Sequence, residues 1–172
     1  MISNLKIFIF FIILLVLNEI YQSYYRQYIR KKIYKDAKLK SKLLNKPLMV
    51  IGDPFNGIGS QKHGVAYGCG DICLDLTGCP KCKNGDKGKL ENILPKYKSN
   101  SHIIFISCVL EYVDDIENVW KNLIRIAGDV SNIFLVTVSG FCFTAYFYKE
   151  KNYSAKRIIK DFNNNQINYM EI

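Results

Sequence analysis

The sequence predicts a mostly parallel α/β domain preceded by an N-terminal transmembrane helix, and three observations support this fold class. His102–Leu110 is an apolar run without alternation, which is typical of a strand buried on both faces. A helical pattern follows it, and Ile133–Val138 is a second β-branched run closed by Ser139-Gly140. Two buried strands joined by a helix form a crossover between parallel strands. The third observation is a long apolar segment at the start of the chain.

The helix between the two strands has a start signal, a stop signal and one apolar face. Asp114 and Glu117 stand three residues apart, which is the spacing of a capping box. Gly128 stands where a helix C-cap is expected. The apolar stripe at three- and four-residue intervals consists of Ile116, Val119, Trp120, Leu123 and Ala127.

The remaining elements of the domain are shorter. Leu48–Ile51 is expected to be a strand that runs into the turn Gly52-Asp53-Pro54. The other expected elements are a strand at Ile72–Leu76, a loop at Lys81–Lys89, a helical turn at Leu90–Leu94 stopped by Pro95, a strand at Phe141–Tyr148 and a short helix at Ala155–Phe162.

The first 25 residues are predicted to be a transmembrane anchor. Ile7–Leu17 is an uninterrupted apolar run, but no small-residue cleavage site follows it as it would in a signal peptide. Instead a tyrosine-rich cluster follows, of the kind found at a membrane–water interface, and residues 5–25 together are long enough to span. A cleaved signal peptide and an amphipathic helix lying on the membrane surface are the alternatives.

Residues 26–46 are predicted to be a basic juxtamembrane linker between the anchor and a domain at residues 47–172. This segment holds nine Lys or Arg and one acid, which accounts for +8 of the net charge of +9. The domain is therefore nearly neutral, and no nucleic-acid partner is expected. The positive-inside rule places the basic segment, and with it the domain, in the cytosol. The segment would also bind anionic lipid headgroups.

Three strand ends are polar or rich in glycine, and ligands of open parallel sheets bind beyond such ends. The turn from Gly52 to Gly57 allows close backbone approach, Asp75 could hold a ribose diol, and Glu111 stands just before the helix. Together with NSHIIFISCVLEYVDDIENVWKNLIRIAG, these features resemble the S-adenosylmethionine-dependent methyltransferases of the Rossmann-like class. The similarity is good over residues 89–140 and weaker back to residue 48. The pattern GDP…DLTGCP…SCVLEYV is also similar to proteins of large DNA viruses.

The resemblance implies a truncated, methyltransferase-like sheet that binds S-adenosylmethionine. Gly52, Asp53 and Gly57 would lie against the cofactor, Asp75 would bind its ribose, and Ser107 and Cys108 would line the pocket. The chain departs from the family because no acid precedes Gly52, and because Tyr112 replaces the commoner histidine. No catalytic residue can therefore be assigned.

The same residues also have purely structural interpretations. Gly52-Asp53-Pro54 could be a simple strand-end turn, and Asp75 could cap a loop. Glu111 could do no more than help start the helix.

Four of the six cysteines are close in sequence: Cys69, Cys73, Cys79 and Cys82. Cys79-Pro80-Lys81-Cys82 resembles a zinc knuckle, and a redox pair is another possibility. If Cys69–Leu76 is a strand, about 13 Å separates Cys69 from Cys73, which is too far for one zinc ion. No metal site is therefore expected unless the strand begins after Cys69 and the chain folds back. A cytosolic domain would have no disulfides, and Cys108 and Cys142 are expected to be buried thiols.

The sequence therefore predicts a membrane-anchored, methyltransferase-like protein whose substrate is unknown. The alternatives are a catalytically inactive scaffold or interaction module of the same fold, with a protein partner, and a small zinc-binding domain. An enzyme requires Gly52, Asp75 and Ser107 to converge at one edge of the sheet, around an open pocket. If Tyr67, Phe55 or another side chain fills that space, the catalytic claim has to be dropped.

Overall fold

The computed structural model describes residues 2–55, 67–137 and 168–171, and it has the expected α/β architecture with a parallel sheet. The helices are α1 (Ile2–Leu43), α3 (Leu90–Ile93) and α4 (Ile116–Ala127), with short 3-10 turns at Leu94–Lys96 (η1), Leu110–Tyr112 (η2) and Val130–Asn132 (η3). The strands are β1 (Leu48–Ile51), β2 (Ile72–Asp75), β3 (Gly85–Lys87), β4 (Ile103–Ser107), β5 (Ile133–Thr137) and β6 (Asn168–Glu171).

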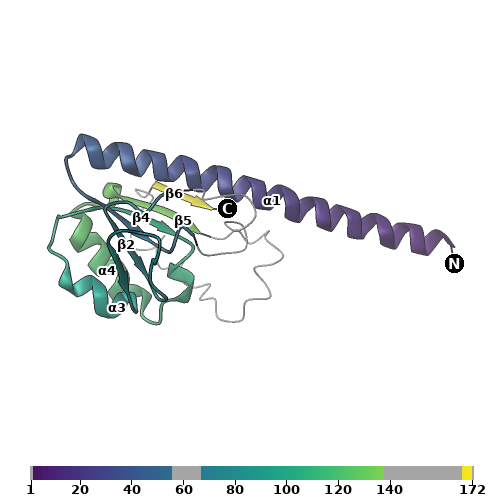
Figure 1. The fold of residues 1–172 in the computed structure, drawn as a ribbon. Helices are drawn as coiled ribbons and strands as arrows, with labels where there is room; N and C mark the ends of the chain where they lie inside the picture. Colours follow the sequence, from purple (N-terminus) through teal and green to yellow (C-terminus); the bar gives the residue numbers. More distant parts are fainter. Residues whose placement is uncertain (1, 56–66, 138–167, 172) are drawn as a thin grey trace.

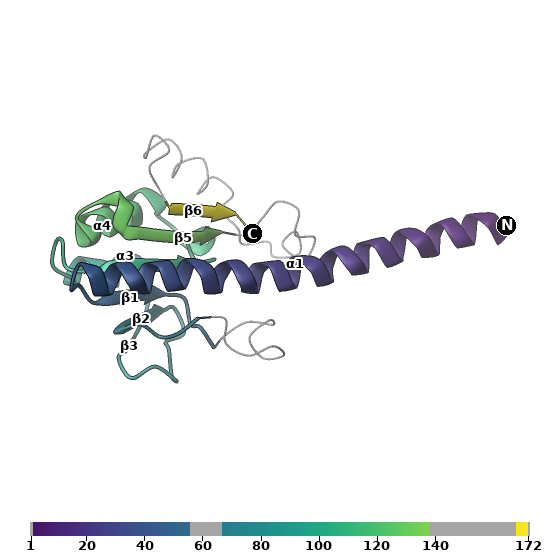
Figure 2. The same ribbon diagram turned by 90° about the horizontal axis from the view of Figure 1, so that it is seen from above.

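The six strands form one sheet in the order β3-β2-β1-β4-β5-β6, and every neighbouring pair is parallel. Helices cover both faces, so the domain has three layers, with α3 and α4 on one side and α1 on the other (Figures 1 and 2). The central strands are buried along their whole length, which explains why their sequences do not alternate between apolar and polar residues.

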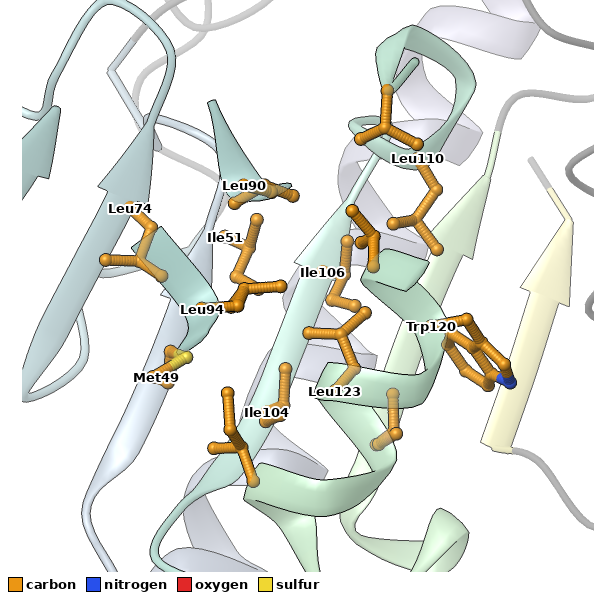
Figure 3. Close-up of a cluster of buried hydrophobic side chains, with 14 of the residues drawn as sticks. Met49, Ile51, Leu74, Leu90, Leu94, Ile104, Ile106, Leu110, Trp120 and Leu123 are labelled. Atoms are coloured by element: carbon orange, nitrogen blue, oxygen red, sulfur yellow. The ribbon is translucent and has the colours of Figure 1, made fainter. Parts of the chain in front are cut away.

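Side chains of each central strand point alternately into two separate cores. Ile104 and Ile106 of β4 pack with Trp120 and Leu123 of α4, as Figure 3 shows, together with Leu90 and Leu94. The intervening residues of the sheet pack against α1 on the opposite face. That second core contains Ile29, Ile33, Ala37, Leu48, Val50, Cys73, Cys79, Ile103, Phe105, Phe134 and Val136.

Helix α4 begins one residue later than the sequence pattern predicts. Asp115 is the N-cap, and its carboxylate accepts the N–H of Asn118 at 3.0 Å. Asp114, expected in that role, instead forms an ion pair with Lys89 at 2.6 Å. The predicted C-cap is confirmed, because Gly128 has a left-handed φ of 76° and donates its N–H to Ile124.

Two strands at the edges of the sheet were not expected from the sequence. β3 lies inside the segment 81–89, which the sequence indicates as a loop, because its three exposed polar residues have no strand pattern. β6 lies in the polar tail of the chain. The strand expected at Phe141–Tyr148 and the helix expected at Ala155–Phe162 lie outside the described residues.

Helix α1 is longer than the predicted anchor and passes directly into the domain. It is long and apolar enough to cross a membrane, and its most apolar part is not buried against the rest of the protein. The helix continues to Leu43, and Ile29, Ile33 and Ala37 are buried against the sheet. The basic segment at 26–46, expected to be a linker to a domain at 47–172, thus also supplies one layer of the fold.

Candidate functional site

The carboxyl ends of β2, β1 and β4 meet at one edge of the sheet, which we call the carboxyl edge. The strand order changes direction between β1 and β4, and such a position binds ligands in open α/β sheets. The structure brings together the residues that the sequence singled out here. The N–H of Gly52 donates to Leu74 at 2.8 Å, and the N–H of Asp53 donates to Oδ2 of Asp75 at 3.1 Å. A Cβ built on Gly52 would lie 3.1 Å from the carbonyl oxygen of Ser107.

Asp75 at the end of β2 organises the turn beside it. Its Oδ1 accepts hydrogen bonds from the N–H of Thr77 at 2.8 Å and from the hydroxyl of Thr77 at 2.7 Å. Its Oδ2 accepts the N–H of Asp53. A carboxylate offers about four acceptor positions, so the contacts made by the described residues leave one for a ligand hydroxyl. The side chain is half-buried rather than enclosed. This geometry suits both a ribose-binding carboxylate and a turn cap.

Gly52 is needed by the chain itself, because its φ of 104° strains any other residue. A Cβ at this position would also lie 3.0 Å from the side chain of Val109 and 3.8 Å from the hydroxyl of Tyr67. The space between β1 and β4 next to Gly52 is therefore filled by protein, Tyr67 included, so the open pocket that catalysis requires is not met beside Gly52. Asp53 accepts the N–H of Phe55 at 2.9 Å, which fixes the turn after β1. Gly57, the third expected cofactor contact on this turn, lies outside the described residues.

A polar group of five residues, which we call the edge cluster, lies at the end of β4: Arg30, Tyr67, Ser107, Cys108 and Glu111. Arg30 of α1 donates to the sulfur of Cys108 at 3.1 Å. The ring of Tyr67 lies 5.0 Å from that of Phe105, between α1 and the sheet. The edge cluster joins α1 to the carboxyl edge.

Cys108 has a left-handed φ of 53°, as residues at sharp strand-to-helix turns often do. Burial raises the pKa of its thiol, and this outweighs the opposite effect of the Arg30 guanidinium. Burial likewise raises the pKa of Tyr67 to about 12. Both groups are therefore neutral at physiological pH, so the cluster offers no thiolate nucleophile.

Arg30 was not expected at this site, and Tyr67 was expected only as a side chain that could fill its space. Arg30 follows Ile29 in α1, and the i, i+4 repeat of Ile29, Ile33 and Ala37 marks the buried face of that helix. That repeat indicates a buried helix face, but the many lysines around it give the segment the composition of an exposed one. Tyr67 carried no comparable signal.

The four clustered cysteines form a separate feature next to β2. The structure pairs Cys69 with Cys82 and Cys73 with Cys79 as disulfides, so the expectation of no disulfides is wrong for these four residues. β2 begins only at Ile72, and Cys69 lies before it. The chain folds back there, so Cys69 and Cys73 do not lie on one extended strand. The separation of about 13 Å expected for a strand therefore does not apply to them.

The same cysteines could hold a metal in their reduced state. The sulfurs of Cys73, Cys79 and Cys82 lie within 4.8 Å of one another, although they come from two different bridges. Tetrahedral zinc with Zn–S bonds of about 2.3 Å needs sulfur separations of about 3.8 Å. Once reduced, Cys73, Cys79 and Cys82 could thus supply three thiolate ligands to one metal ion.

No family model matches this chain, and no curated protein or solved structure matches it either. The arrangement of the described residues is thus what any functional proposal has to rest on.

Proposed function

We propose that this chain is a membrane-anchored, methyltransferase-like protein that binds S-adenosylmethionine at the carboxyl edge of its sheet. The observation that carries the proposal is the contact between Asp75, at the end of β2, and the glycine-containing turn after β1. In the resembling family these two strand ends hold the adenosyl part of the cofactor. The bound cofactor would supply an activated methyl group, and Asp75 would orient its ribose through the free acceptor position.

Calorimetry with S-adenosylhomocysteine on the full chain in detergent tests this proposal. Asp75→Asn removes the charge that would accept the ribose hydroxyls, and hydrogen bonds to charged groups contribute about 1.5–3 kcal/mol. The dissociation constant should therefore rise about 10- to 100-fold. Asp71→Asn is the matched control, because Asp71 accepts the N–H of Leu48 at the opposite end of the sheet. No binding of the wild-type chain at millimolar ligand would contradict the proposal.

A second candidate function is an interaction module that has kept the fold and lost the cofactor. Tyr67 favours it, because its hydroxyl lies beside Gly52 between β1 and β4, where the reactive end of a cofactor would lie. In that case Asp75 caps a turn and nothing more. Asp75→Asn would then lower the melting temperature without changing any ligand affinity.

We further propose that the domain lies on the cytosolic side of the membrane. The excess of lysine and arginine after the apolar segment supports this orientation. The two disulfides weigh against it, because such bridges are typical of oxidising compartments. Trypsin added to sealed cells should leave the domain intact if the orientation is cytosolic, and should digest it if the domain is outside.

A further inference from the structure

We propose that the carboxyl edge docks onto the surface of an anionic lipid bilayer. Docking rests on the membrane anchor of the proposed function, on the direction of α1 and on the exposed side chains of the edge.

The direction of α1 relative to the strands is fixed by contacts at both edges of the sheet. Lys40 donates to the carbonyl oxygen of Ser131, just before β5 begins, at 2.6 Å. Arg30 donates to Cys108, just after β4 ends, at 3.1 Å. Ten helical residues rise about 15 Å, which matches the length of a five-residue strand. Helix α1 therefore runs antiparallel to the strands, with its N-terminal half beyond their carboxyl ends (Figures 1 and 2).

The distance from the membrane to the carboxyl edge follows from the same helix. A hydrocarbon core about 30 Å thick takes about 20 helical residues, so a span that starts at Leu5 ends near Tyr25. Arg30 lies five residues further, a rise of about 7.5 Å. The headgroup layer is about 5–8 Å deep on each side of the core. The continuous helix thus places the carboxyl edge at the level of the headgroups.

Exposed apolar side chains give independent support for contact with the membrane. Among residues 45–55 and 67–137, the exposed large hydrophobic side chains are Leu76 and Tyr112, at 61% and 45% exposure. Leu76 directly follows β2, and Tyr112 ends the turn that follows β4. Both therefore lie at the carboxyl edge, on the side from which the apolar half of α1 emerges.

The charge near this edge selects anionic rather than neutral lipid. Lys31 and Lys32 are exposed on α1 next to Arg30, and exposed Lys81 lies 5.2 Å above the ring of Phe55 after β1. Basic residues close to an anionic surface contribute about 1 kcal/mol each. A ligand that reaches Asp75 from this side would come from the lipid headgroup layer.

Tryptophan quenching in nanodiscs tests the docking directly. The full chain is placed in discs of phosphatidylglycerol and brominated phosphatidylcholine, as Leu76→Trp, Tyr112→Trp or Leu44→Trp. Leu44 is the control, because it is an exposed leucine in the turn before β1, at the amino edge of the sheet. The native Trp120 is fully buried and gives the same background in every variant.

Apolar groups at an interface sit about 5–10 Å deep, so quenching at positions 76 and 112 should exceed that at 44 at least about twofold. Equal quenching at the three positions would overturn the docking.

Discussion

The basic segment of α1 should be required for folding, and deletion variants can establish this. The comparison is between residues 26–172, which lack the apolar span, and residues 47–172, which lack the whole helix. The shorter fragment loses Ile29 and Ile33, which are 4% and 6% exposed in the folded chain. It should fail to fold because one face of the sheet would be left in contact with water.

The expected size of this effect follows from the buried side chains. Complete burial of one isoleucine contributes about 1.5–3 kcal/mol, so the two contribute about 3–6 kcal/mol. The sheet residues beneath α1, among them Phe105 and Val50, would be exposed at the same time. The combined loss is on the order of 10 kcal/mol, which equals the whole stability of a typical domain of about 5–15 kcal/mol.

Thermal unfolding followed by circular dichroism, together with size-exclusion chromatography, measures the outcome. Residues 26–172 should give a cooperative transition, and residues 47–172 should be unfolded or aggregated. Point variants refine the comparison. Ile33→Ala should lower the free energy of unfolding by about 2–5 kcal/mol. Leu39→Ala on the same helix removes a side chain that is 60% exposed. Its free energy of unfolding should stay within about 0.5 kcal/mol of the unsubstituted fragment.

A monomeric 47–172 fragment that melts cooperatively within a few degrees of the longer fragment would refute this reasoning. It would mean that α1 lies against a sheet which is stable without it.

Three further predictions concern His102 and the four clustered cysteines. Burial lowers the pKa of His102 below its usual 6.5, so the unfolded chain binds a proton more readily. The free energy of unfolding should therefore fall as the pH drops below about 6.5. Measured by urea unfolding, it should depend less on pH over that range in His102→Gln. The reduced chain should bind about one Zn²⁺, measured by competition with a chromogenic chelator, and Cys82→Ser should weaken this binding. After oxidation, only the two cysteines outside the bridges should react with maleimide in denaturant, and reaction of all six would contradict the pairing.

Local sequence patterns were sufficient for the central unit of the fold. β4, α4 and β5 lie where the apolar run, the helical stripe and the second β-branched run indicate, because burial on both faces or on one face dictates those patterns. The C-cap at Gly128 was predictable because few other residues accept its left-handed φ. The same holds for the meeting of Gly52, Asp75 and Ser107, since parallel strands end at the same edge.

Long-range contacts decided the rest. Residues 26–46 have the composition of a solvated linker, and only the sheet beneath them makes Ile29 and Ile33 a buried face. Tyr67 and Arg30 reach the site from segments 37 residues apart in the chain, so no local spacing could pair them. The four cysteines come together because β2 starts after Cys69 and the chain folds back. The direction of α1, whose apolar half extends beyond the carboxyl edge, follows from packing against the sheet, because a helix of the same sequence could lie against it in either direction.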